Sequence, residues 1–317
     1  MRWFQAFVDA TNVFYDHLAA VRWWPLAIAL GLLFLRLMLR AVAWRNILQA
    51  SYPTTKVRWL PVFGAYVAGI GVNAIIPARV GDAVKVALAK QRIEGSSYAT
   101  VAATLIVETL FDFFVAFGLF AWALTLGVLP GLHVLRDLPS VDWSWPLSHQ
   151  RASAGIGAAL IVALVVVGIW AGRRAVAFWA RVRQGFAILR SPWRYLRDVV
   201  SWQAASWVLR IASFYYFLRA FGITATIHNA LLTQVVQSLS TLFPITPGGA
   251  GTEQGLLVYV FRGREAATPL LSYSVGMKIA VTAFTVVLGF AALGLMVRTF
   301  SPSRAIKQAG EGGLDRD

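Results

Sequence analysis

Charged side chains lie inside stretches of this sequence that are otherwise apolar. Glu108 and Asp112 stand four residues apart, so a helix places both carboxylates on one face. Basic side chains lie in other apolar stretches, at Arg36, Arg40, Arg210 and Lys278. Ionised groups are costly in hydrocarbon, so we expect them to face a protein interior and to pair there, with Glu108 and Lys278 as the first expected pair. The predicted charge network consists of Arg40, Glu108, Asp112, Arg210 and Lys278. Structural ion pairing and a path for a substrate or a proton are equally compatible with it.

A second group of polar residues surrounds a proline in the apolar stretch 59–92. The run Ile-Pro-Ala-Arg-Val-Gly-Asp at 76–82 breaks any straight helix, because proline removes a backbone donor and clashes with the preceding turn. The short helix expected after this break presents free N–H groups to an anion, such as a phosphodiester. Arg79 can add a bidentate contact and Lys85 a point charge. The substrate-binding residues predicted here are Asn73, Arg79, Asp82 and Lys85. The alternative is that Asp82 only caps the helix and that the cations lie among the inner headgroups.

The apolar stretch 227–262 has a similar break, Pro-Ile-Thr-Pro-Gly-Gly-Ala-Gly at 244–251. Its glycines allow the backbone to approach a ligand closely, and Thr252 or Glu253 can cap the helix that follows. The substrate-binding residues predicted here are Gly248, Gly249, Gly251 and Glu253. The alternative is a tight turn of the kind that any re-entrant loop needs.

Soluble enzyme chemistry finds little support in the sequence. There is no cysteine, and the four histidines lie in loops and chain ends without metal-ligand spacing. No P-loop, GxSxG or dinucleotide-binding motif is present. We therefore expect no cofactor, no metal and no enzyme, although a membrane transferase that uses Glu108 or Asp112 as a base is a third hypothesis.

Composition places most of the chain in lipid, since 58% of its 317 residues are hydrophobic and only 14% are charged. The net charge of +15 would suggest nucleic acid for a soluble protein, but here it fits membrane orientation, and no nucleic acid partner is expected. Full membrane spans are predicted at about 22–47, 98–128, 152–172, 199–221 and 269–297. The first span is interpreted as retained and not as a signal peptide.

The positive-inside rule is satisfied if both broken stretches are re-entrant hairpins. The loops then assigned to the cytoplasm hold 18 Lys and Arg, against 6 outside. This predicts a multi-pass protein of the bacterial inner membrane with a cytoplasmic C-terminus. Residues 3–18 and 173–197 are predicted to be amphipathic interfacial helices. The second serves either as a topology anchor or to attract anionic headgroups.

A constant offset of 170 residues relates the two halves. It carries Pro77 and Gly81 to Pro247 and Gly251, and Arg40 to Arg210. The predicted fold is therefore an all-α polytopic transmembrane helix bundle with two re-entrant broken hairpins in an inverted repeat. The chain 1–317 forms a single integral-membrane domain, with a first repeat at 22–128, a connecting span at 152–172, a second repeat at 199–297 and a disordered tail at 301–317. Many secondary transporters follow this plan and bind substrate where broken helices meet.

Four segments carry a resemblance to a known family: RAVAWR at 40–45, NAIIPARVGDAVK at 73–85, ETLFD at 108–112 and FPITPGGAGTE at 243–253. Over roughly residues 20–300 the chain resembles the lysylphosphatidylglycerol synthase transmembrane region, also called the flippase-like family. The resemblance implies an inner-membrane bundle of the kind that translocates aminoacylated phosphatidylglycerol in multiple peptide resistance factor proteins. The sequence shows neither the acyltransferase-like domain that transfers lysine nor the extra N-terminal span of many members, so lysyl transfer is not expected.

The leading hypothesis is a flippase-like translocase that moves an anionic phospholipid or related lipid between leaflets. Stand-alone members of the family resemble proteins encoded with hopanoid, cardiolipin or glycolipid pathways. The alternative is therefore a membrane-embedded lipid-binding subunit of a lipid, glycolipid or hopanoid biosynthetic enzyme. The expected partners are membrane lipids with anionic headgroups; a biosynthetic partner enzyme and a homo-oligomer are both compatible with the sequence.

Overall fold

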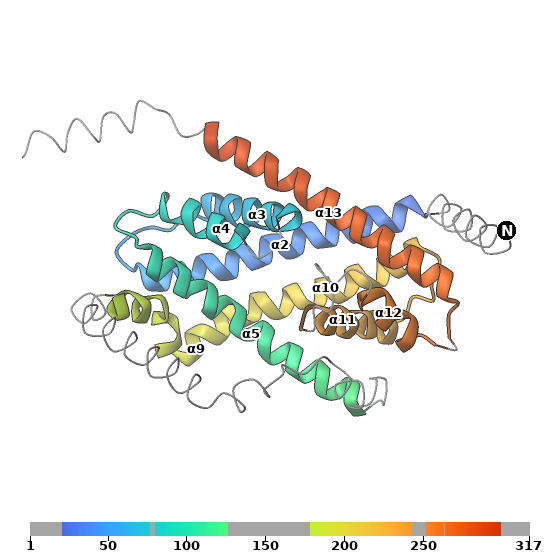
Figure 1. Cartoon of the computed structure of the whole chain (residues 1–317). Helices are drawn as coiled ribbons and strands as arrows, with labels where there is room; N and C mark the ends of the chain where they lie inside the picture. Colours follow the sequence, from blue (N-terminus) through green and yellow to red (C-terminus); the bar gives the residue numbers. More distant parts are fainter. Residues whose placement is uncertain (1–20, 77–79, 126–177, 243–251, 263, 299–317) are drawn as a thin grey trace, which may run out of the picture.

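The structure is a computed structural model that describes residues 21–76, 80–125, 178–242, 252–262 and 264–298 (Figure 1). All regular structure in these ranges is helical. Within them, three helices are long and apolar enough to cross a membrane: Trp23–Ser51, Tyr98–Trp122 and Ala267–Met296. The predicted all-α membrane bundle is thereby confirmed. The predicted span 152–172, the segment 3–18 and the tail 301–317 lie outside the described residues.

Helix α2 (Trp23–Ser51) and helix α10 (Ser201–Ala220) pack side by side along much of their length (Figure 1). Exposed Trp23 and Trp24 at the start of α2 suit a membrane interface. Helix α10 matches the predicted span 199–221 but is more polar than the three apolar helices, because it buries polar side chains toward the interior. Its Ser213 Oγ donates to the carbonyl of Ala29 on α2 at 2.9 Å.

The first broken stretch forms two helices, α3 (Trp59–Ile75) and α4 (Val80–Lys90), that pack against each other. Ile76 adopts an extended conformation, as expected for a residue that precedes proline. The two helices approach so closely that a Cβ added at Gly81 would lie 1.9 Å from the carbonyl oxygen of Gly69. The predicted helix, break and helix are therefore present here. Helix α5 (Tyr98–Thr125) follows, with its first turn capped by Ser97 Oγ, which accepts from the Thr100 N–H at 3.1 Å.

The second broken stretch forms α11 (Ile227–Leu242) and α12 (Thr252–Val260), which contact each other, and α13 (Ala267–Arg298) follows. Before α10, the short helices η1 (Ala187–Arg190), α9 (Pro192–Tyr195) and η2 (Leu196–Val200) lead into it. Exposed Trp179 and Trp193 lie among exposed arginines in this region, which suits the predicted interfacial segment 173–197.

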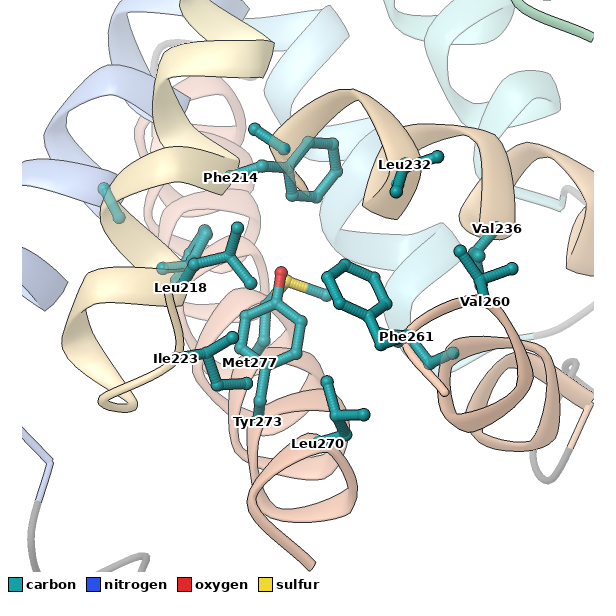
Figure 2. Close-up of a cluster of buried hydrophobic side chains, with 14 residues drawn as sticks. Phe214, Leu218, Ile223, Leu232, Val236, Val260, Phe261, Leu270, Tyr273 and Met277 are labelled. Carbon is teal, nitrogen blue, oxygen red and sulfur yellow. The ribbon is translucent and has the colours of Figure 1, made fainter. Parts of the chain in front are cut away.

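Each half of the chain has a hydrophobic core of its own. One core is formed mainly by α2, α3, α4 and the start of α5, and the other by α10 to α13 (Figure 2). Helix α13 also crosses α3, where a Cβ added at Gly71 would lie 2.6 Å from the Cα of Gly289. The two halves are thus joined along α2 and α10 and again at this glycine crossing. The inverted relation between them stays a prediction.

Candidate functional site

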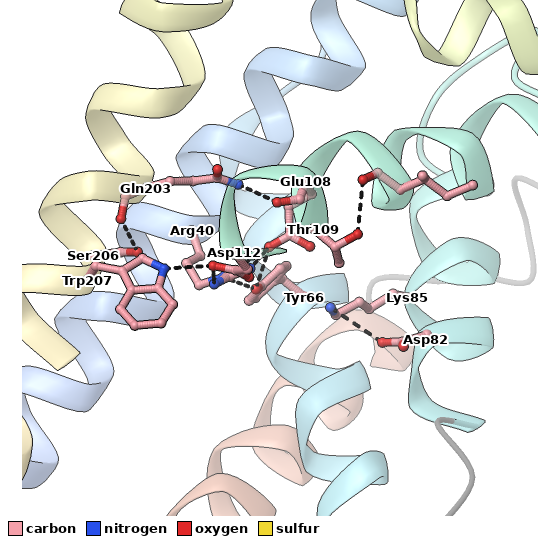
Figure 3. A network of polar contacts seen from close by, with 11 residues as sticks. Arg40, Tyr66, Asp82, Lys85, Glu108, Thr109, Asp112, Gln203, Ser206 and Trp207 are labelled. Carbon is pink, nitrogen blue, oxygen red and sulfur yellow. Dashed lines mark hydrogen bonds and ion pairs between the residues drawn. The ribbon is translucent and has the colours of Figure 1, made fainter. Parts of the chain in front are cut away.

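A buried arginine joins four helices at the centre of the bundle, and we call its surroundings the Arg40 centre (Figure 3). Arg40 of α2 forms a two-nitrogen contact with Asp112 of α5, at 3.0 Å from Nη1 to Oδ1 and 2.6 Å from Nη2 to Oδ2. The same guanidinium donates to Glu108 through Nη2 and, at 3.0 Å, through Nε. Tyr66 of α3 accepts from Arg40 Nε at 2.7 Å and donates to Glu108 Oε1 at 3.0 Å. From α10, Trp207 Nε1 donates to Asp112 Oδ1 at 2.7 Å.

The Arg40 centre satisfies its charged groups internally. Arg40 and Glu108 are only 6% and 3% exposed, while the side chain of Asp112 is 28% exposed. Two carboxylates share one guanidinium, so the hydrogen bonds from Tyr66 and Trp207 supply the remaining stabilisation. The predicted network members Arg40, Glu108 and Asp112 therefore do meet. The predicted Glu108–Lys278 pair was wrong: Glu108 faces Arg40 on α2, whereas Lys278 on α13 faces Glu253 of α12.

A second polar region is a cavity of about 160 Å³ between α2, α10, α11, α12 and α13, which we call the basic cavity. Its charged lining consists of Arg36, Arg210, Lys278 and Glu253. Three cations thus face one carboxylate in the interior of a membrane protein. The remaining wall is largely apolar and includes Phe214, Phe217 and Met277.

Two of the three cations of the basic cavity, Arg36 and Arg210, form no ion pair with a carboxylate in the described residues. Arg210 Nη2 donates to Gln237 Oε1 at 3.1 Å, and its guanidinium lies 5.0 Å from the centre of the Trp207 ring. Lys278 Nζ lies 4.0 Å from Glu253 Oε2, at the limit of an ion pair. Arg36 forms no hydrogen bond or ion pair with any residue in the described ranges. Because ionised groups inside a membrane need a counter-charge, this cavity is suited to hold an anion.

The predicted site at the first break is built differently. Asn73 Oδ1 accepts from the Gly81 N–H at 2.7 Å, and Asn73 Nδ2 donates to Asp82 Oδ1 at 3.3 Å. Lys85 is 6% exposed; its Nζ lies 3.6 Å from Asp82 Oδ1 and 4.1 Å from the centre of the Tyr66 ring. These three predicted substrate-binding residues come together, but their polar groups contact one another and hold α3 to α4.

Other predicted site residues fall in two places. Glu253 is buried near the start of α12 and lines the basic cavity with Arg210 and Lys278. The remaining predicted site residues, Arg79, Gly248, Gly249 and Gly251, lie outside the described residues.

Several residues of the two polar regions were missing from the predicted site. Arg36 stood in an apolar span one helical turn before Arg40, and this spacing was the signal that could have placed it near the network. Gln237 belongs to a polar group in an apolar stretch, Gln234 to Ser238. Tyr66 and Trp207 carry no such signal, because aromatic residues are common in membrane helices and only packing brings these two to the carboxylates.

Comparison with known protein families gives a match. A family model described as the lysylphosphatidylglycerol synthase TM region matches residues 3–289, which is most of the chain and includes both polar regions. No curated protein and no solved structure matches the sequence.

Proposed function

Because the chain belongs to the lysylphosphatidylglycerol synthase TM region family, we propose that it moves an anionic lipid between the two leaflets and holds the headgroup in the basic cavity. The family relates the chain to lipid metabolism in a membrane. The excess of three cations over one carboxylate in the basic cavity is the observation that carries the proposal. We place the protein in the bacterial inner membrane with a cytoplasmic C-terminus, following its loop charges.

The excess of positive charge in the lining of the basic cavity supports an anionic ligand. A basic side chain in the middle of a bilayer costs about 2.5–3.5 kcal/mol on insertion scales, and a counter-charge offsets part of that cost. Arg36 and Arg210 carry planar guanidinium groups, which match the oxygens of a phosphate in a two-point contact. A lipid phosphodiester is therefore the ligand group we assign to these two arginines.

The other two charged residues of the basic cavity, Lys278 and Glu253, allow its charge arrangement to change when a ligand binds. Lys278 has a side chain that is 43% exposed, while its partner Glu253 is largely buried. The two atoms stand at 4.0 Å, and the long, flexible side chain of Lys278 allows its ammonium to turn toward an arriving phosphate. We assign Lys278 the role of following the headgroup and Glu253 that of restoring the empty state.

The Arg40 centre has a supporting role in this proposal. Arg40 lies one turn after Arg36 on α2, and its guanidinium is already shared by Glu108 and Asp112. These contacts tie α2 to α5, and Trp207 adds α10. The centre thus fixes the helices that carry Arg36 and Arg210, and we assign it positioning, not ligand binding.

Reconstitution into liposomes tests the proposal. The protein is incorporated with a trace of phosphatidylglycerol carrying a nitrobenzoxadiazole label, and leaflet exchange is followed by dithionite quenching of the label. The double variant Arg36→Gln/Arg210→Gln removes two charge-assisted contacts, each worth about 1.5–3 kcal/mol, so the exchange rate should fall at least about tenfold. Arg219→Gln is the matched control, because Arg219 is an exposed cation on the same helix as Arg210 and does not line the cavity.

Two results would contradict the proposal. Wild-type vesicles that exchange label no faster than protein-free vesicles would exclude translocation under these conditions. Equal exchange rates in the double variant and the Arg219→Gln control would show that the headgroup does not bind in the basic cavity. Tight lipid binding without exchange would favour the alternative, a lipid-binding subunit of a biosynthetic enzyme.

A further inference from the structure

An apolar groove of about 190 Å³ lies between α5 and α11, and we call it the α5–α11 groove. Its lining on α5 includes Ala116, Phe117 and Leu119, and on α11 it includes Val235 and Leu239. Phe117 is 65% exposed, so this wall faces outward. Since α5 is long and apolar enough to cross a membrane, we expect this outward-facing wall to face hydrocarbon.

The α5–α11 groove corresponds, by the 170-residue offset, to the place where α3 and α13 cross at two glycines. The 170-residue offset carries α3 onto α11 and relates α5 to α13, so the α5–α11 contact is the counterpart of the α3–α13 contact. At the crossing, a Cβ added at either Gly71 or Gly289 would lie 2.6 Å from the Cα of the other glycine. The counterpart of Gly289 is Leu119, which lines the groove. The α5–α11 contact thus has a leucine where the α3–α13 crossing has a glycine, and a groove lies between its two helices.

Hydrocarbon fits this space better than water does. All but one of its lining residues are apolar, the exception being Ser238, whose hydroxyl accepts from Gln234 Nε2 at 2.8 Å. Apolar cavities of about 150 Å³ stay dry and bind small apolar molecules, so a groove of this size accepts a stretch of acyl chain.

The groove also lies next to the basic cavity. Helix α11 separates the two, with Gln237 lining the basic cavity while its neighbours Val235 and Ser238 line the groove. A lipid whose headgroup enters the cavity therefore has a place for a chain on the other side of the same helix. Resting on the function proposed above, we infer that the α5–α11 groove binds an acyl chain of the transported lipid.

An uncharged lipid tests the groove separately from the headgroup. Dioleoylglycerol has the acyl chains but no charge, so its binding does not depend on the arginines of the basic cavity. We expect native mass spectrometry of the full chain to show a retained dioleoylglycerol in the wild type. Ala116→Trp fills the groove and should lower this occupancy about tenfold. Ala283→Trp is the matched control, since Ala283 is an exposed alanine on α13 and the 170-residue counterpart of the groove residue Phe113.

The outcomes separate the inference from the proposed function. Equal loss in Ala116→Trp and Ala283→Trp, or undiminished occupancy in Ala116→Trp, would overturn the inference. Ala116→Phe is the second variant if the tryptophan variant elutes as an aggregate in size-exclusion chromatography, and it is judged by the same comparison. Loss of dioleoylglycerol in Ala116→Trp but not in Ala283→Trp, together with no leaflet exchange in the wild type, would support acyl-chain binding in the groove and reject translocation.

Discussion

At the scale of single residues, the interior cations of this protein divide into two classes. Arg40 is surrounded by acceptors from α3 and α5, and its charge is fully engaged. Arg36, one turn earlier on the same helix, lines a cavity and forms no hydrogen bond or ion pair within the described part of the chain. Burial penalises both charges, so the difference between them separates a structural centre from a candidate ligand site.

Removal of Arg40 should destabilise the protein strongly. Arg40→Met leaves Glu108 and Asp112 as uncompensated carboxylates, and breaking a buried ion pair from one side costs about 3–5 kcal/mol. A clear fall in the midpoint of thermal unfolding in detergent is the expected readout.

A second substitution identifies the cause. Arg40→Met/Glu108→Gln removes one of the uncompensated charges, so part of the lost stability should return. An unfolding midpoint of Arg40→Met equal to that of the wild type would mean that the Arg40 centre contributes nothing to stability.

At the scale of elements, the hairpin of α3 and α4 depends on close backbone approach and on one amide side chain. Gly69 and Gly81 bring the helices into contact, and Asn73 accepts from the first turn of α4. Lys85 then lies against the Tyr66 ring and links the hairpin to the Arg40 centre (Figure 3). The hairpin therefore positions one of the donors to Glu108.

A methyl group at Gly81 should open this hairpin. In Gly81→Ala the new Cβ would meet the carbonyl of Gly69, and overpacking of this kind costs about 1–3 kcal/mol. Gly118→Ala is the control on α5, because no heavy atom lies within 4 Å of a Cβ added there. Alanine stabilises a helix relative to glycine by up to about 1 kcal/mol, so this variant should be at least as stable as the wild type. The midpoints of thermal unfolding of Gly81→Ala and Gly118→Ala are compared in the same detergent. Equal midpoints in the two variants would contradict the role of Gly81.

At the scale of the whole molecule, the two larger hydrophobic cores and the contacts between the two halves are compatible with the plan of an inverted repeat. Each half buries its own apolar cluster, and α2 meets α10 along their lengths. If the second half is inverted, the connection between α4 and α5 and the connection between α12 and α13 must lie on opposite sides of the membrane.

Cysteine labelling tests this arrangement in a natural background without cysteine. Glu94→Cys lies in the first connection and Ala266→Cys in the second, and both positions are exposed. In intact cells, an impermeant maleimide should label Ala266→Cys and leave Glu94→Cys unlabelled, since the first connection carries the cytoplasmic basic residues. Labelling of both positions from the same side would reject the inverted repeat and, with it, the counterpart relation used for the α5–α11 groove.

Much of the element layout could be predicted from the sequence. Long apolar runs fix membrane helices, because backbone groups in lipid must bond within their own helix. Proline at 77 ends α3 at Ile75 for steric reasons that need no tertiary contact. The spacing of Glu108 and Asp112 likewise placed both on one face of α5, where they now meet Arg40.

Partner choice was decided only by the tertiary structure. Helical periodicity tells which side chains share a face, but it does not tell which neighbouring helix that face meets. Glu108 therefore pairs with Arg40 and not with Lys278, and the predicted substrate-binding residue Lys85 lies against the Tyr66 ring. Arg36 likewise lines a cavity only because five helices pack around it, and the sequence of any one of these helices does not predict that cavity.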